Sequence, residues 1–243
     1  MHRNSSRRGG RREKKVRVKT ARRRPASSTR WLDRQLNDPY VAEARRLGYR
    51  SRAAFKLIEI DDRLRLFRPG QTVVDLGAAP GGWTQVALER TRAAETGGRV
   101  IALDRLEIDP VPGAEILLGD FQDAATLARL EQTLGGARAD LVLSDLSPST
   151  TGHRATDHLR IVTLAEDALA FAEGVLKPGG AFVAKVFRGG ADADLLKRVR
   201  ARFETVRHFK PPASRKDSAE TYLVAQGFQP LETQFTVTCT GKS

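Results

Sequence analysis

Lys185 and Asp145 are the two residues whose surroundings most strongly indicate chemistry. Lys185 interrupts the apolar run 181–187, and Asp145 directly follows the strand-like run 140–144. A lysine in a strand that is buried on both faces loses water, which favours its neutral form and allows it to act as a base. A lysine at a strand end can instead reach water, and an aspartate there can cap a turn. On neighbouring strands the two would form a charge pair at the carboxyl edge of a sheet, which is the arrangement we expect.

A glycine-rich turn joins an apolar strand to a helical pattern in the stretch 73–83. Glycines allow a tight turn and a close approach of backbone to a ligand, and the following helix offers unpaired N–H groups. The sequence Gly-Ala-Ala-Pro-Gly-Gly at 77–82 is not the G-x-G-x-x-G of dinucleotide enzymes, and Pro80 lacks the N–H that a pyrophosphate would need. A tight turn without a ligand is the alternative. The turn suits a nucleoside without phosphates, and we predict S-adenosylmethionine as the cofactor.

Two further acids follow the next two predicted strands. Asp104 ends the run 99–103, and Asp120 follows Leu118 and a glycine. An acid at the end of the second strand of such a sheet accepts hydrogen bonds from a ribose diol. We expect Asp120 to meet the adenine amino group, with Phe121 nearby. Each acid alone is a common helix or turn cap, but their order after the glycine-rich turn indicates a cofactor site.

Two other charged residues cannot be chosen from local patterns. The helical face that carries Lys56 is otherwise charged, with Arg52, Glu59 and Arg63 at helical spacing. Such a face is typical of a solvated surface. Glu220 begins the last predicted strand after a polar loop, which is typical of a charge at a sheet edge.

These residues need a scaffold that brings strand ends together. Apolar strand-like runs alternate with helical patterns, which indicates a parallel sheet covered by helices on both faces. The predicted strands are 72–76, 100–103, 115–118, 140–144, 181–187, 205–209 and 221–225. The clearest helical patterns are 51–64 and 157–176, the latter ended by Lys-Pro-Gly-Gly at 177–180. The segment 210–219 has no helical pattern and predicts an antiparallel hairpin at the sheet edge. We therefore predict one Rossmann-like α/β domain with the class I methyltransferase arrangement: seven strands, mostly parallel, with an antiparallel last strand.

The positive charge of the chain is concentrated at its N-terminal end. The net charge is +13 over 243 residues, and the first 30 residues hold 13 of the 42 lysines and arginines with one acid, Glu13, so they carry +12 of it. A segment of this kind cannot build a core. We predict a disordered basic arm at 1–30, the catalytic domain at 31–228 and a tail at 229–243. The arm is either a solubilising disordered end or, as we expect, a segment that binds nucleic-acid phosphates without sequence preference.

Several classes of protein are disfavoured by composition. The chain has no apolar run of 18 residues, its basic N-terminal segment lacks the apolar stretch that is typical of a signal peptide, and its one cysteine is Cys239. We expect a cytoplasmic protein without an internal disulfide or a membrane partner. His153 and His158 have no further His or Cys placed to complete a metal site, so no metal is expected.

Five separated segments resemble, in order, the FtsJ-type family of RNA 2′-O-ribose methyltransferases. They are 51–57, 73–83, 144–145, 182–187 and 214–222, and the resemblance covers about 31–227. The resemblance implies a Lys-Asp-Lys-Glu catalytic tetrad at Lys56, Asp145, Lys185 and Glu220. It implies cofactor contacts by Gly81, Trp83, Asp104, Asp120 and Asp145. One departure lies at 145–149, which reads Asp-Leu-Ser-Pro-Ser where many members have Asp-Met-Ala-Pro-Asn, so Ser149 replaces an asparagine.

The same resemblance implies a reaction and a partner. The expected activity is transfer of a methyl group from S-adenosylmethionine to the 2′-hydroxyl of a uridine ribose in 23S rRNA, by a monomer. The expected partner is that rRNA within the large ribosomal subunit or its late precursor. Two alternatives remain: a tRNA anticodon loop as the substrate, or an RNA-assembly factor that binds the cofactor without needing turnover.

Overall fold

The computed structural model describes residues 26–148, 151–187 and 193–230. The helices are α1 (Ala26–Leu36), α2 (Pro39–Leu47), α3 (Ala53–Leu64), α4 (Gly82–Thr91), α5 (Ala93–Thr96), α6 (Ala124–Leu134), α7 (Arg154–Val175) and α8 (Ala193–Arg202). The strands are β1 (Thr72–Leu76), β2 (Arg99–Asp104), β3 (Ala114–Leu118), β4 (Ala139–Ser144), β5 (Leu176–Phe187), β6 (Phe203–Phe209) and β7 (Glu220–Phe228). Helix α1 begins inside the predicted arm 1–30, and the rest of that arm lies outside the described residues, as does the predicted tail from residue 231 onwards.

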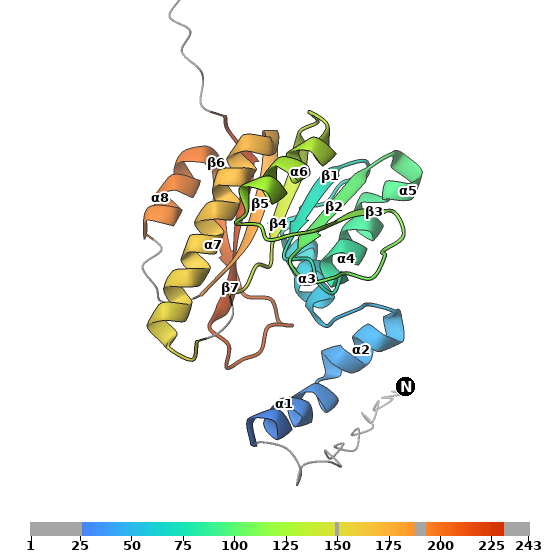
Figure 1. Cartoon of the computed structure of the whole chain (residues 1–243), viewed down its shortest axis with the longest axis vertical. Coiled ribbons are helices and arrows are strands. Elements are labelled where there is room, and N and C mark those ends of the chain that lie inside the picture. Colours follow the sequence, from blue (N-terminus) through green and yellow to red (C-terminus); the bar gives the residue numbers. More distant parts are fainter. Residues whose placement is uncertain (1–25, 149–150, 188–192, 231–243) are drawn as a thin grey trace, which may run out of the picture.

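The seven strands form one sheet in the order β3-β2-β1-β4-β5-β7-β6 (Figure 1). The pairs from β3 to β5 are parallel, and β7 runs antiparallel to both β5 and β6. This confirms the predicted mostly parallel sheet with a reversed last strand. The strand order reverses between β1 and β4, and sheets of this class bind their ligands in the crevice beyond the carboxyl ends of such strands.

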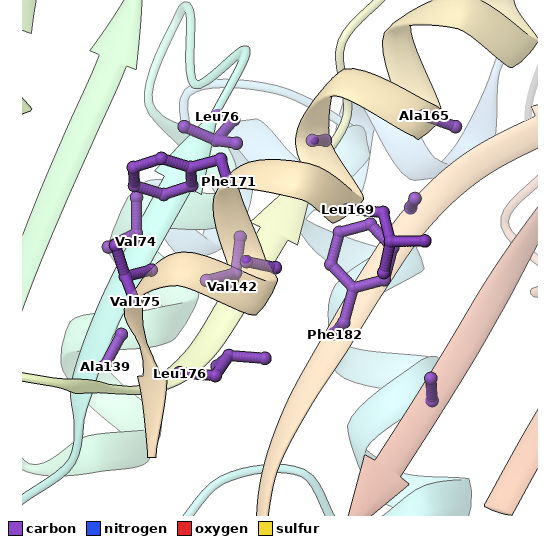
Figure 2. Packing of buried hydrophobic residues seen from close by; sticks show 14 of the residues in the cluster. Val74, Leu76, Ala139, Val142, Ala165, Leu169, Phe171, Val175, Leu176 and Phe182 are labelled. Atoms are coloured by element: carbon purple, nitrogen blue, oxygen red, sulfur yellow. The ribbon is translucent and has the colours of Figure 1, made fainter. Parts of the chain in front are cut away.

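Helices cover both faces of the sheet, as predicted (Figure 1). On one face α6, α7 and α8 enclose a core that includes Val142, Leu169 and Phe182 (Figure 2). On the other face α3 and α4 pack on a second core. Because successive side chains of a strand alternate between faces, Phe182 belongs to the first core and Val183 to the second. Lys185 has the same parity as Val183, so it faces the side of α3 and α4.

The predicted element bounds differ from the structure in two places that matter here. The helix predicted from residue 51 begins at Ala53. The helix predicted over 157–176 is α7, and Leu176 already begins β5 because it is buried opposite Ala139 of β4. The Lys-Pro-Gly-Gly segment therefore lies inside the bounds of β5, where the pairing with β4 shifts register. Within the three described ranges, no helix has the length and apolar character that crossing a membrane requires.

Candidate active site

Lys185 and Asp145 meet at the carboxyl edge of the sheet, as predicted. Strands β4 and β5 are parallel neighbours with Ser144 opposite Ala184, which brings the next residue of each strand together. The Nζ atom of Lys185 lies 3.0 Å from Asp145 Oδ1 and donates to the backbone oxygen of Asp145 at 2.7 Å. Lys185 is only 8% exposed, so its side chain ends in a buried charge pair and does not extend into water.

Lys56 and Glu220 form a second pair that local patterns do not predict. The Nζ atom of Lys56 lies 2.7 Å from Glu220 Oε1, and Lys56 is 8% exposed. The interpretation of its helical face as solvated is wrong, because the β6–β7 loop (210–219) covers that face. Arg52 donates to the backbone oxygen of Ala213, and Glu59 accepts from the Ala213 N–H. The edge position expected for Glu220 is also wrong, because β7 lies between β5 and β6.

Tyr222 joins the two pairs, and sequence reasoning missed its role. Its buried hydroxyl donates to Asp145 Oδ1 at 2.8 Å and lies 3.3 Å from Glu220 Oε1. Lys56 Nζ donates to the same hydroxyl at 3.2 Å. The available signal was spacing, since residues two apart in a strand share a face and Tyr222 follows Glu220 by two. The five side chains form one continuous polar chain from Lys56 to Lys185.

The reversed direction of β7 places its first residues at this edge of the sheet. Pairing with β5 sets Tyr222 opposite Lys185 and Glu220 opposite Phe187. Because β7 is antiparallel, it starts where the parallel strands end. A parallel last strand would carry Glu220 and Tyr222 to the opposite edge, far from Asp145.

The buried charges shift one another's pKa values. Burial raises the pKa of Asp145, but Lys185, Lys56 and the Tyr222 hydroxyl outweigh burial and hold that pKa below its ordinary value. Burial, together with Asp145 and Glu220, raises the pKa of Tyr222 well above its usual value. At neutral pH, Asp145 is therefore a carboxylate and Tyr222 a hydroxyl that can donate to it.

A further carboxyl, Asp75 of β1, lies fully buried near this site. Its Oδ2 accepts from the Thr84 hydroxyl at 2.7 Å, while its Oδ1 has no hydrogen-bond partner among the described residues. Burial, opposed by the hydrogen bond from Thr84 and reinforced by the charges of Asp145 and Asp104, raises the pKa of Asp75 to about 7. Asp75 therefore changes charge near neutral pH, which an ordinary aspartate does not do.

A cavity of about 690 Å³ opens beside the Lys185–Asp145 pair. Its lining includes predicted catalytic and cofactor residues, namely Asp104, Asp120, Asp145 and Lys185. The glycine-rich turn contributes Gly77, which has a φ of +77°. A Cβ atom there would lie 2.8 Å from the backbone nitrogen of Leu146, so only glycine permits this close approach of the β1 and β4 ends.

Asp104 and Asp120 also hydrogen-bond to the turns that carry them. Asp104 accepts from the N–H of Ala79 at 2.9 Å and from the N–H of Leu106 at 2.8 Å. Asp120 accepts from the N–H of Gln122 at 3.0 Å. Asp104 and Asp120 therefore both accept hydrogen bonds within turns and line the cavity. Asp104 also connects the glycine-rich turn to the end of β2.

Gly81 and Trp83 are not among the residues that line this cavity, although both are predicted to contact the cofactor. The buried Trp83 donates from Nε1 to the backbone oxygen of Ala53 at 2.8 Å and packs on Tyr222 with ring centroids 5.5 Å apart. Gly81 has a φ of +106°, and a Cβ atom there would lie 3.2 Å from Arg50. Trp83 therefore contacts the start of α3, and Gly81 lies beside Arg50 and Val111.

Arg50 braces two loops beside the glycine-rich turn, a role that sequence reasoning missed. Its guanidinium donates to three backbone oxygens, those of Pro80 at 3.2 Å, Asp109 at 2.5 Å and Pro110 at 2.6 Å. Its backbone N–H donates to Gln85 Oε1 at 2.8 Å. Arg50 thereby joins the start of α3 to the glycine-rich turn and to the loop after β2.

A second pocket, of about 400 Å³, adjoins the Lys56–Glu220 pair. It is lined by α1, α3, the β6–β7 loop and the first residue of β7, through Gln35, Arg52, Lys56, Arg215, Asp217, Ser218 and Glu220. One lysine–carboxylate pair thus borders each cavity, and the Tyr222 hydroxyl lies between the pairs. This arrangement can hold a group donor in one cavity and an acceptor in the other, with proton-carrying side chains between them.

Residues 49–228 match the model of the FtsJ-like methyltransferases. The chain belongs to the FtsJ-like methyltransferase family. A relative from Paramagnetospirillum magneticum, named ribosomal RNA large subunit methyltransferase E, is 60% identical over 223 residues, which is 91% of each chain. A relative of the same name from Granulibacter bethesdensis is 58% identical over 91% of this chain and 94% of its own. A solved structure from Plasmodium falciparum, described as a ribosomal RNA methyltransferase, is 29% identical, has a TM-score of 0.67 and covers 74% of this chain and 98% of its own.

Membership of the FtsJ-like family confirms the resemblance read from the sequence. The matched segment contains every predicted catalytic and cofactor residue. Ser149, at the position of the family's usual asparagine, lies outside the described residues. Among the residues that the structure describes, no group of three or more His, Cys, Asp or Glu side chains could hold a metal ion.

Proposed function

We propose that the protein transfers a methyl group from S-adenosylmethionine to the 2′-hydroxyl of a uridine ribose in 23S rRNA of the large ribosomal subunit. The observation that carries the proposal is the polar chain from Lys56 to Lys185, which borders one cavity at each end. Relatives at about 60% identity over most of both chains are named for methylation of this RNA, which supports the substrate.

The first cavity fits the proposed cofactor in the chemistry of its lining. Asp104 and Asp120 offer carboxylate oxygens at the ends of β2 and β3, where a nucleoside presents its hydroxyl and amino donors. Because Gly77 has no side chain, the ends of β1 and β4 come close together, and both line the cavity. S-adenosylmethionine, when bound, supplies a methyl group on a sulfonium that is already strongly electrophilic.

The residues of this chain have to position the acceptor and take up its proton. We assign Lys185 as the base: its Nζ, in the unprotonated form, would take the proton of the ribose 2′-hydroxyl as that oxygen attacks the methyl group that S-adenosylmethionine would supply, with the thioether as the leaving group. Asp145 orients Lys185 through its carboxylate and backbone oxygens. Lys56 and Glu220, tied to Asp145 through Tyr222, face the acceptor side. Alignment and proton transfer together supply most of the acceleration.

One experiment tests the function against its rivals. The 2′-O-methyl groups of all rRNA and tRNA would be mapped by mass spectrometry in a strain that lacks the gene. We expect one uridine of 23S rRNA to lose its methyl group and wild-type protein to restore it, while Lys185→Ala does not. A methyl group missing only from a tRNA anticodon loop would overturn the substrate. Complete rescue of subunit assembly by Lys185→Ala would indicate an assembly factor that does not need turnover.

The basic arm 1–30 is proposed to hold RNA phosphates during this reaction. Its support is the charge of +12 before the family domain, because cations that neutralise phosphates release counterions. Deleting residues 1–25 should therefore weaken RNA binding and flatten its salt dependence, with methyl transfer retained at saturating RNA.

A further inference from the structure

We infer that the second pocket binds a phosphodiester group of the RNA strand beside the acceptor ribose, with Arg215 and Arg52 as its ligands. The inference rests on the proposed function, because it takes RNA as the acceptor. The pocket lies between α1, α3 and the β6–β7 loop, and it shares Lys56 and Glu220 with the catalytic chain. Its occupant is therefore a direct neighbour of the reacting ribose.

The lining of the pocket suits a phosphate and not a base. Among the side chains that the structure describes, every one that lines the pocket is polar or charged, and none of them is aromatic or aliphatic. Proteins that hold unstacked bases use aromatic side chains or guanidinium planes as stacking platforms, whereas phosphate oxygens are held by arginine and hydroxyl donors. Gln35 and Ser218 add an amide and a hydroxyl that can donate to the same group.

The two arginines are only partly neutralised by the protein. Asp38 is the shared carboxylate: its Oδ2 lies 2.8 Å from Arg52 Nε and 3.8 Å from an Arg215 terminal nitrogen. The carboxylate of Glu220 is already paired with Lys56, with 2.7 Å between Glu220 Oε1 and Lys56 Nζ. One carboxylate thus serves two guanidiniums, and the longer distance leaves the donors of Arg215 available to a ligand. Arg215 is also the more exposed of the two.

Arg52 is preorganised for this role. Its guanidinium lies over the Tyr40 ring at 5.7 Å and donates to the backbone oxygen of Ala213, in addition to its contact with Asp38. A charged side chain that is already fixed loses little entropy when a ligand arrives. Arg52 is also the N-cap residue of α3, four residues before Lys56, so the phosphate site and the predicted catalytic lysine are positioned by the same helix.

The contrast with Arg50 shows that the basic segment 50–52 is divided between two tasks. Arg50 donates to backbone oxygens beside the first cavity, and Arg52 lines the second pocket. Asp217 lines the same pocket, and its negative charge repels a phosphate and so opposes the effect of the arginines. The inference therefore predicts effects of opposite sign at two residues of one loop.

The test uses full-length protein and large ribosomal subunits from the strain that lacks the gene. The acceptor KM, kcat and the dissociation constant for 23S rRNA would be measured for Arg215→Ala, Asp217→Asn and the control Lys216→Ala. Lys216 is exposed and lies between the other two without lining the pocket. Arg215→Ala should raise both KM and the dissociation constant about tenfold, with kcat and cofactor affinity unchanged. Its salt slope should fall by about 0.7, one single-strand phosphate.

Asp217→Asn should lower the acceptor KM by about twofold, and Lys216→Ala should change it less than twofold. Equal values for Arg215→Ala and Lys216→Ala would overturn the phosphate site, as would a loss confined to kcat. If wild-type protein methylates the subunits and Arg215→Ala binds RNA normally, only this inference fails. If wild-type protein neither binds 23S rRNA nor methylates it, the proposed function fails as well.

Discussion

The two lysine–carboxylate pairs of the site are equally buried but are built differently. Lys185 and Asp145 come from neighbouring parallel strands, so the register of the sheet sets their separation. Lys56 and Glu220 come from a helix and from the start of β7, under a loop that closes over α3. The first pair belongs to the sheet beside the first cavity, which we propose for the cofactor. The second depends on side-chain and loop packing beside the second pocket, which we propose for the acceptor.

This difference suggests a division of labour. A pair fixed by sheet register suits the step that tolerates the least displacement, which is removal of the proton during methyl transfer. A pair held by a helix and a loop can adjust when a large RNA docks. We therefore expect changes at the sheet pair to act on turnover, and changes around the helix pair to act on acceptor binding as well.

The largest effect should follow from removing the base of the sheet pair. Lys185→Ala should lower kcat by about 10²–10⁴-fold, because the proton of the ribose hydroxyl then has no acceptor. Lys185→Arg should fail as well, since a guanidinium stays protonated. Single-turnover rates of the three proteins, with cofactor affinity measured by calorimetry, decide the matter. A fully active arginine variant would assign Lys185 to charge stabilisation and remove the distinction between the pairs.

Tyr222→Phe tests whether the two pairs act as one unit. Loss of the hydroxyl removes a donor to Asp145 and an acceptor for Lys56, and kcat should fall by about tenfold. The hydrogen bond from Tyr222 helps to hold the pKa of Asp145 down. Without it that pKa rises, so the Asp145 carboxyl should take up its proton at a higher pH in the variant, which an NMR titration of the folded protein would measure. An unchanged kcat together with an unchanged Asp145 titration would show that the pairs work independently.

Arg50→Ala tests whether cofactor binding depends on the hydrogen bonds by which Arg50 holds the glycine-rich turn and the loop after β2. Three hydrogen bonds to backbone oxygens are lost, which should loosen the turn that contains Pro80 and weaken cofactor binding by about fivefold. The salt dependence of RNA binding should stay the same, because Arg50 is already engaged with the protein. Asp104→Ala, which removes a cavity-lining carboxylate, should cause a larger loss of cofactor affinity by calorimetry. A reduced salt slope for Arg50→Ala would instead place this arginine on the RNA.

The smallest effect on activity is expected at Asp75, which is not among the residues that line either cavity. Its folded-state pKa of about 7 is above the unfolded value, so between about pH 4 and 7 the folded protein holds a proton that the unfolded chain has released. Unfolding free energy from this group therefore falls as pH rises, by about 1.4 kcal/mol per pH unit. Asp75→Asn can keep the hydrogen bond from Thr84 and should remove this decline. Denaturant unfolding of both proteins from pH 5 to 8 would show it, and parallel curves would contradict it.

The sheet pair could be predicted from the sequence because its evidence is local. A strand that is apolar on both alternations makes a charged residue such as Lys185 conspicuous, and the end of a strand marks the edge at which Asp145 lies. The same regularity predicted the seven strands and the reversed last one. Errors in the bounds were confined to places such as Leu176, where tertiary pairing with Ala139 decides how soon the strand begins.

The helix pair could be predicted only from the family resemblance and not from local patterns, because burial of Lys56 depends on a loop that lies about 160 residues later in the chain. Helical spacing correctly placed Arg52 and Glu59 on the same face but gave no sign that Ala213 would cover it. The role of Tyr222 could not be predicted for a related reason. An aromatic residue in a central strand ordinarily belongs to the hydrophobic core. For Trp83, the family resemblance predicted a cofactor contact that the packing of α4 on α3 does not show.

The hydroxyl of Tyr222 has one proton and two carboxylates within reach, at 2.8 Å and 3.3 Å. It can therefore satisfy Asp145 or Glu220 at a given moment, but not both. Swinging that single proton from one acceptor to the other would strengthen one carboxylate's hold on its lysine while relaxing the other's. The buried phenol thus links the hydrogen bonding of the two pairs, because donation to one carboxylate withdraws the proton from the other.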